Sequence, residues 1–573
     1  MLQTLTTPRG KTLSGTPWQV YPRPQMRRDS YINLNGEWDF AVSSGKPETF
    51  DMRILVPFCP ESRLSGIGRH FEEGAPLWYR RRFLLHEGFR RERVLLHIGA
   101  ADQIAEVFVN GQHLCRHEGG YASFCVDITE ALAEENELVI RCTDDLHDQA
   151  FPYGKQVMNQ GGMWYTPVSG IWQTVWLESV PDIYIEKLNI ENHGASVTIS
   201  TVPPLEGTVS VEPLGQFPLE NGQVTIAPEN PHFWCPDDPY LYRFALETAQ
   251  DRVESYFAIR SLEIKKVGEY PRLCLNGKPY FFHGLLDQGY WPEGLLTAPA
   301  PESYADDILA MKRLGFNTLR KHIKVEPEEF YYQCDRLGMI VWQDMVNNGS
   351  YRYFRDTVLP TIGIQKWNDR RLHLDERSRN TFRQGAADAV NQLKNHPCIC
   401  YWTIFNEGWG QFDSDRVCGW FRTLDATRFI DTTSGWFRGK NTDVDSRHQY
   451  FGKLRLTGDG LRPLVLSEFG GKTWRVEGHI FNPDKAYGYG ACPTREALNE
   501  AVAALYRESI VPAVEKGLCA AIYTQVSDVE DEVNGLITYD RRVVKLDADT
   551  MLPISRALQD AMEKTVASFE KMG

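Results

Sequence analysis

The feature that most limits the possible folds of this chain is an apolar run that ends in an amide, an acid and a glycine. Residues 398–405 read Cys-Ile-Cys-Tyr-Trp-Thr-Ile-Phe, and Asn406, Glu407 and Gly408 follow. A strand that is apolar on both faces is typical of a parallel sheet covered on both sides by helices. In an α/β barrel, a carboxylate at the C-terminal end of such a strand lies where active sites are built. The run therefore predicts a barrel strand and makes Glu407 a catalytic candidate.

A second apolar run repeats this pattern at residues 463–471, where Glu468 is followed by Phe469 and two glycines. For one such glutamate alone, a structural role as a helix cap or as the partner of a barrel lysine is favoured over a catalytic role. Two glutamates in the same topological position favour a shared active site. Glycoside hydrolysis requires such a pair, because one carboxyl group protonates the leaving oxygen and the other attacks the anomeric carbon or activates water.

Three motifs resemble glycoside hydrolase family 2, the family of β-galactosidases, β-glucuronidases and β-mannosidases. They are Trp402-Thr-Ile-Phe-Asn-Glu-Gly-Trp-Gly410, Ser467-Glu-Phe-Gly-Gly471 and Leu34-Asn-Gly-Glu-Trp-Asp-Phe40. The resemblance extends over nearly the whole chain. It implies a retaining mechanism with Glu407 as acid/base, Glu468 as nucleophile and Asn406 as the partner of the substrate 2-hydroxyl. It requires no cofactor.

Length and composition limit the remaining alternatives. The chain has 573 residues, enough for two to four domains, and a net charge of −14, which disfavours nucleic acid as a partner. We find neither a signal-peptide pattern nor an apolar run of membrane-spanning length, so we expect a cytoplasmic protein that does not contact membranes. The cysteines are scattered and lack zinc-ligand spacing, so no metal is expected. The expected partner is an oligosaccharide or glycoside substrate, and a homo-oligomer remains open.

The pattern of strands and helices predicts a multidomain chain. Residues 1–180 contain short strands, with a hairpin signal at Asn110-Gly111, and correspond to the jelly-roll sugar-binding sandwich of the resembled family. Residues 181–265 suit a smaller immunoglobulin-like β-sandwich. Residues 266–573 alternate strands and helices, which predicts a catalytic (β/α)8 TIM barrel. Trp164 and Tyr165 either line the rim of the active site or belong to the sandwich core.

We expect eight βα units in the barrel and a final helix over 556–571. The expected strands lie at 280–286, 316–322, 339–344, 398–405, 429–436, near 448–450, 463–467 and 520–525. A sugar site needs hydrogen-bonding groups for the hydroxyls and rings for the apolar face of the pyranose. The strand ends offer both kinds as candidate substrate-binding residues: Asp287, Arg320, His322, Asp344, Trp436, His448, Tyr450, Trp474 and Gln525. We expect Arg320 to hold Glu468 ionised, whereas Asp287 contacts a sugar hydroxyl or merely caps its turn.

The sugar is inferred from one segment near the C-terminus. β-Glucuronidases carry an Asn-x-Lys element that meets the substrate carboxylate, and Glu532 and Asn534 stand in those two places here. A glutamate there disfavours a uronate, so we predict an exo-acting β-galactosidase. β-Glucuronidase, β-mannosidase, β-galacturonidase and arabinosidase are the alternatives within the family. A catalytically inactive carbohydrate-binding protein is the alternative from another class.

Overall fold

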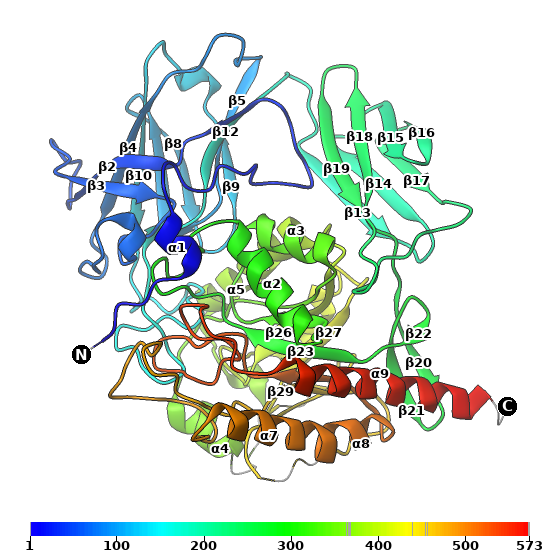
Figure 1. Ribbon diagram of the computed structural model, residues 1–573. Helices are drawn as coiled ribbons and strands as arrows, with labels where there is room; N and C mark the ends of the chain where they lie inside the picture. The colour runs from blue at the N-terminus through cyan, green and yellow to red at the C-terminus, as the bar shows by residue number, and fades with distance from the viewer. Residues whose placement is uncertain are drawn as a thin grey trace.

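Three apolar cores organise the chain. The computed structural model describes residues 2–361, 364, 368–437, 439–452, 454 and 456–570. One core fills the N-terminal sandwich, a second fills a smaller sandwich, and the largest lies around an eight-stranded barrel. In Figure 1 the two sandwiches sit above the barrel, the first in blue and cyan and the second in green. This architecture confirms the predicted fold class.

The N-terminal jelly-roll sandwich packs a six-stranded sheet against a four-stranded one. The first has the order β3-β2-β4-β10-β7-β8, the second β1-β12-β5-β9, and β11 pairs with β6. The bounds are β1 Tyr31–Asn33, β2 Gly36–Val42, β3 Met52–Val56, β4 Leu77–Phe83, β5 Arg93–Ile98, β6 Ala101–Asp102, β7 Ile104–Val109, β8 Gln112–Glu118, β9 Phe124–Asp127, β10 Asn136–Thr143, β11 Gly170–Ile171 and β12 Val175–Val180. Asn110 and Gly111 join β7 to β8 with φ of 49° and 82°, as a two-residue hairpin turn requires.

The immunoglobulin-like sandwich consists of two small antiparallel sheets. Their orders are β13-β14-β17 and β16-β15-β18-β19. The bounds are β13 Lys187–Asn192, β14 Val197–Val202, β15 Gly207–Glu212, β16 Gly215–Leu219, β17 Gln223–Ile226, β18 Tyr242–Thr248 and β19 Arg252–Phe257. Burial alternates along β14, because alternate side chains enter the core between the sheets. A hairpin of β20 (Leu262–Val267), β21 (Tyr270–Leu275) and β22 (Lys278–Pro279) then leads into the barrel.

The barrel sheet is parallel and has the order β27-β26-β25-β24-β23-β30-β29-β28. The bounds are β23 Phe282–Asp287, β24 Thr318–Lys321, β25 Ile340–Asp344, β26 Ile399–Asn406, β27 Phe429–Ser434, β28 Asp445–Gln449, β29 Leu464–Phe469 and β30 Leu518–Tyr523. All eight residues of β26 are buried, as the apolar run predicted. The seam between β27 and β28 is closed by the bond from the Asp443 amide to the Ile430 carbonyl, 2.9 Å.

The helical layer is less regular than eight βα units predict. Its principal helices are α2 Glu302–Arg313, α3 Glu328–Leu337, α5 Glu376–Leu393, α6 Ser414–Phe421, α7 Arg495–Leu505 and α9 Ala548–Glu570. Among the described residues, no helix separates β27 from β28 or β28 from β29. Both connections contain glycine, and the first bonds back to β27 through Thr432 Oγ1 and the Asn441 carbonyl, 2.6 Å. α9 begins earlier than predicted, and the predicted end at residue 571 lies outside the described part.

No helix within the described ranges combines the length and apolarity needed to cross a membrane.

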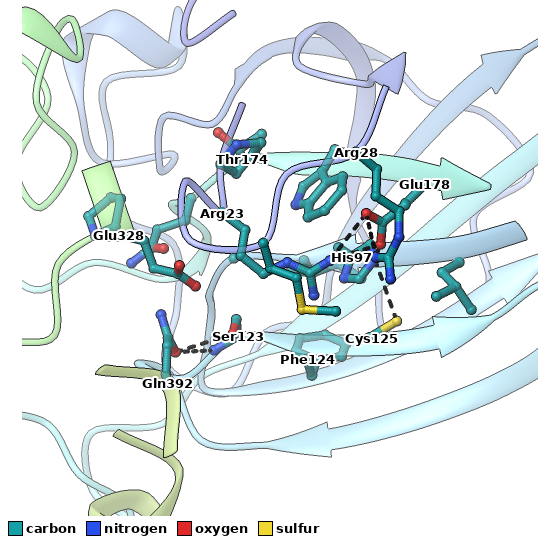
Figure 2. Close-up of a pocket in the computed structure, with 18 of the residues that line it drawn as sticks. Arg23, Arg28, His97, Ser123, Phe124, Cys125, Thr174, Glu178, Glu328 and Gln392 are labelled. Carbon is teal, nitrogen blue, oxygen red and sulfur yellow. Dashed lines mark hydrogen bonds and ion pairs between the residues drawn. The ribbon is translucent and has the colours of Figure 1, made fainter. Parts of the chain in front are cut away.

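Polar contacts join the N-terminal sandwich to the barrel. A cavity of about 430 Å³ lies where the two sandwiches meet α3 and α5, and Figure 2 shows residues that line it. On its wall, Glu178 is paired with Arg23 and Arg28, and the Ser123 hydroxyl bonds Gln392 of α5 at 3.2 Å. Of these contacts, the one between Ser123 and Gln392 joins the sandwich to the side of the barrel.

Candidate active site

The turn after β26 presents Asn406 and Glu407. Glu407 has a φ of 51°, in the left-handed region that residues other than glycine rarely adopt. Gly408 follows with a φ of 80°. The Glu407 amide donates to the carbonyl of Ser434 at the end of β27, 2.9 Å. Backbone conformations of this kind concentrate at functional sites, where surrounding contacts hold them. The turn thereby redirects the glutamate away from the path of the strand.

Glu468 lies near the end of β29 and is 3% exposed. Arg320 Nη1 donates to its Oε1 at 2.9 Å, and the Tyr450 hydroxyl donates to its Oε2. Burial alone would raise the pKa of Glu468, but the charges of His448, Arg320 and His322 and the Tyr450 hydrogen bond lower it to about 2. This carboxyl group is therefore ionised at neutral pH.

Arg320, at the end of β24, links several groups that the sequence singled out. Besides Glu468 it donates to Asp344 Oδ1 at 3.0 Å and to Asn406 Oδ1 at 2.8 Å. His322 Nδ1 lies 2.7 Å from the other oxygen of Asp344. Burial raises the pKa of Asp344, but Arg320 and His322 outweigh it and hold that pKa below the ordinary value. The guanidinium is thus shared by two carboxylates and an amide oxygen.

His448 bridges the two glutamates. Its Nδ1 lies 2.8 Å from Glu407 Oε1, and its Nε2 lies 3.5 Å from Glu468 Oε1 and 3.1 Å from Ser434 Oγ. One carboxylate oxygen of Glu407 and one of Glu468 lie within 4.8 Å of each other. These three residues approach one another closely enough to hold a cation, but Arg320 and Tyr450 already occupy the oxygens of Glu468. The arrangement is better suited to proton transfer and nucleophilic attack.

Aromatic rings surround the glutamates. Trp436 lies edge-on to His448 with centroids 5.9 Å apart, and Tyr450 stacks on Tyr489 at 4.1 Å. On the other side, Trp409 stacks on Trp164 of the N-terminal sandwich at 5.2 Å. Tyr165, the neighbour of Trp164, is fully buried, and its hydroxyl donates to Glu532.

Three predicted residues make their described contacts away from the two glutamates. Asp287 pairs with Lys321 Nζ at 2.6 Å. Gln525 bonds Gln288 at 2.7 Å and Asn534 at 2.9 Å. Trp474 packs against the apolar core of the barrel.

Sequence reasoning missed four residues around the site: Lys155, Ser434, Ser467 and Tyr489. Ser434 ends β27 and Ser467 precedes Glu468, so the strand-end criterion could have identified both. Tyr489 comes from a long loop after β29, and Lys155 comes from the N-terminal sandwich. No local pattern in the sequence connects either residue with a barrel strand.

Comparison with known proteins gives two family matches. The model for "Glycosyl hydrolases family 2, TIM barrel domain" matches residues 266–455. The model for "Glycosyl hydrolase 2 galactose-binding domain-like" matches residues 70–162. The two matches fall on the barrel and on the N-terminal sandwich.

Similar proteins carry names of more than one activity. A β-galactosidase of Thermoanaerobacter pseudethanolicus is 24% identical over 57% of this chain and 44% of its own length. A β-glucuronidase of Bacteroides fragilis is 22% identical over 66% of this chain and 56% of its own. The chain thus spans about half the length of these curated relatives. The solved β-glucuronidase of an uncultured Clostridium sp. shares the fold, with a TM-score of 0.71, 18% identity and coverage of 96% of this chain and 100% of that one.

Proposed function

This chain belongs to glycoside hydrolase family 2, and from that premise we propose that it is a retaining exo-β-glycosidase acting on terminal, non-reducing β-linked sugars. One observation carries the proposal. Two buried glutamates from different barrel strands bring carboxylate oxygens within 4.8 Å of each other, and a histidine joins them. Carboxyl groups of retaining glycosidases lie about 5 to 5.5 Å apart, whereas inverting enzymes need about 6.5 to 9.5 Å to admit a water.

In the first step of the proposed mechanism, the Glu468 carboxylate attacks the anomeric carbon. Glu407 gives its proton to the glycosidic oxygen, the bond between that oxygen and the anomeric carbon breaks, and the aglycone leaves as an alcohol. In the second step, Glu407 takes a proton from water while the water oxygen attacks the anomeric carbon. The ester to Glu468 breaks, the sugar leaves with retained configuration, and both glutamates regain their starting states.

The contacts of each residue suit these roles. With a pKa of about 2, Glu468 is ready to attack, and Arg320 stabilises the same carboxylate when the ester later releases it. The amide nitrogen of Asn406 is buried and has no hydrogen-bond partner in the described part of the chain, while its oxygen is held by Arg320. That free donor supports the proposed hydrogen bond to the substrate 2-hydroxyl, which strengthens in the transition state.

For the terminal sugar, β-galactosides are our first choice and β-glucuronides the second. A β-galactosidase and a β-glucuronidase are both among the similar proteins. Glu532 stands beside Asn534 in a buried chain of hydrogen bonds, with Asn534 Nδ2 donating to Glu532 Oε1 at 3.0 Å. The sequence argument against a uronate rests on that glutamate.

A panel of aryl β-glycosides tests the proposal. We expect release of nitrophenol from at least one β-glycoside, a product whose anomeric configuration by NMR is retained, and loss of turnover in Glu468→Gln. Inverted product would reject the assignment of Glu468 as nucleophile. Sugar binding without turnover of any member of the panel would favour the inactive carbohydrate-binding protein.

A further inference from the structure

Lys155 is a buried cation without a charged partner. Four lysines are buried in the described part of the chain: Lys155, Lys321, Lys324 and Lys545. Lys321 pairs with Asp287 at 2.6 Å, Lys324 with Glu326 at 2.8 Å and Lys545 with Asp528 at 2.6 Å. Lys155 is 7% exposed, and its ammonium group has neither an ion pair nor a hydrogen bond among the described residues.

Two aromatic rings are the contacts of this ammonium group. Its nitrogen lies 5.5 Å from the centre of the Trp409 ring and 5.7 Å from that of Tyr165. These distances are close to the limit of about 6 Å for cation–π attraction. Burying an ammonium ion is costly unless an anion or strong acceptors compensate. The two rings supply only part of that compensation, and the Lys155 nitrogen is not among the fully buried side-chain atoms that lack a partner in the described residues, so it is open to an incoming anion.

The position of Lys155 is within the active site. Trp409 lies two residues beyond Glu407, and its ring centre is 6.4 Å from that of His322. Burial lowers the pKa of His322, and the charge of Lys155 lowers it further against the effect of Asp344. The Lys155 ammonium thus lies beside Trp409 and close enough to His322 to influence it, at the edge of the candidate active site.

The sequence argument against an anionic sugar depends on the negative charge of Glu532. The contacts of Glu532 weaken this argument. Its Oε2 accepts a hydrogen bond from Tyr165 and its Oε1 accepts one from Asn534. Tyr165 also contributes the ring beneath the Lys155 ammonium. The glutamate is thus held by two neutral donors, and the Lys155 nitrogen lies 5.7 Å from the ring centre of one of them, Tyr165.

We infer that Lys155 is a specificity-determining residue that binds an anionic substituent, a carboxylate or a sulfate, on the terminal sugar. This inference rests on the proposed retaining β-glycosidase activity, and it replaces the neutral β-galactoside, our first choice from the sequence, by an acidic sugar. The N-terminal sandwich would then contribute directly to substrate choice, because Lys155 comes from the chain between β10 and β11.

The test compares substrates that differ only at carbon 6. Aryl β-galactoside is paired with aryl β-galacturonide, aryl β-glucoside with aryl β-glucuronide, and a 6-sulfated galactoside forms the third arm. We expect a higher kcat/KM for an acidic member than for its neutral partner. Lys155→Met should lower kcat/KM for the acidic substrate roughly 10- to 100-fold, mainly through KM, as loss of a charged hydrogen bond predicts. The neutral partner should change little, and Lys155→Arg should retain most of the selectivity. A preference for the uronides that Lys155→Met removes identifies a carboxylate, and the same behaviour with the 6-sulfated galactoside identifies a sulfate.

Lys265→Met is the matched control, because it makes the same substitution at an exposed lysine of β20 that is not among the residues of the candidate site. Equal losses on both members of a pair, or a wild-type preference for the neutral member, would overturn the inference while leaving the hydrolase intact. If wild type hydrolyses none of these glycosides, calorimetric binding of galacturonate, glucuronate, galactose 6-sulfate and galactose decides separately. Anion binding that Lys155→Met abolishes supports the inference, and its absence rejects it. If Lys155→Met does not fold, Lys155→Gln replaces it in every arm.

Discussion

At the scale of single residues, the two glutamates differ in the groups that hold them. Glu468 accepts from a guanidinium and a phenol, both of which favour its ionised form. The described side-chain partner of Glu407 is His448, whose second nitrogen faces Glu468. A residue fixed as an anion suits nucleophilic attack, and one joined to a histidine suits the gain and loss of a proton.

Azide rescue should distinguish the two roles. In Glu407→Ala, an activated aryl glycoside should still form the glycosyl-enzyme, because a good leaving group needs no proton. Azide should then attack from the face that Glu407 vacated and give the β-glycosyl azide. On a substrate with a poor leaving group, the deficit should be at least about 10²–10⁴-fold, the usual value of acid–base assistance. The product is identified by NMR.

Glu468→Ala serves as the counterpart, because it removes the covalent route. Azide can then enter only from the opposite face and give the α-glycosyl azide. An α-azide from Glu407→Ala together with a β-azide from Glu468→Ala would mean that the two roles are reversed.

Tyr450→Phe tests how Glu468 is kept ionised. Loss of the phenol hydrogen bond should raise the pKa of Glu468 from about 2. Because the ionised form attacks, the acidic limb of the kcat/KM profile should shift to higher pH. The shift should be about one to two pH units, as the loss of a charged hydrogen bond predicts. Tyr506→Phe is the control, since the Tyr506 hydroxyl is buried and unpartnered among the described residues. An unchanged acidic limb in Tyr450→Phe would contradict this account.

The residues that the sequence predicted share one property, which is their position at the end of a barrel strand. Arg320, His448 and Glu468 belong to β24, β28 and β29, which the sheet brings together. Lys155 and Tyr489 could not be found in this way, because a sandwich loop and a loop after β29 deliver them. Their proximity to Glu407 depends on how the domains and long loops pack.

At the scale of elements, the turn after β26 controls the direction of Glu407. Gly408 has a φ of 80°, and a Cβ atom there would lie 2.2 Å from Phe437 Cε2. Gly408→Ala combines the cost of a left-handed conformation, roughly 1 to 2 kcal/mol, with displacement of Phe437. We expect kcat/KM to fall and the melting temperature to decrease, because relief of the contact must move the turn that carries Glu407.

Gly88→Ala separates these two effects. Gly88 has a φ of 79°, and a Cβ atom added there would meet nothing within 4 Å, so only the backbone cost applies. This variant should lose some stability and keep its activity. A Gly408→Ala enzyme as active as Gly88→Ala would show that the turn tolerates the change.

Strands were easier to predict than the segments between them. The run before Asn406 is apolar along its whole length, and β26 covers it almost residue for residue. The eight-unit pattern predicted helices on both sides of β28, but in the described residues glycine-containing connections without a helix lie there instead. The smaller sandwich was predicted from the length and strand count of residues 181–265, and the alternating burial along β14 agrees with it.

At the scale of the whole molecule, the site is built by more than the barrel. The sandwich contributes Trp164, which stacks on Trp409 and lies 4.9 Å from Tyr351 by ring centres. The barrel mouth therefore has a wall that comes from a domain distant in the sequence.

These walls predict exo-action rather than cleavage within a polysaccharide. Trp164 and Trp409 form one side, and the stacked pair of Tyr450 and Tyr489 forms another. An endo-acting enzyme needs an open groove in which several sugars lie on both sides of the scissile bond. We expect these bulky rings to leave room for one terminal sugar, so only chain ends should enter. On a polysaccharide substrate we expect steady release of monosaccharide, measured by chromatography, while the viscosity stays nearly constant. A rapid fall in viscosity with little free monosaccharide would show internal cleavage and would contradict exo-action.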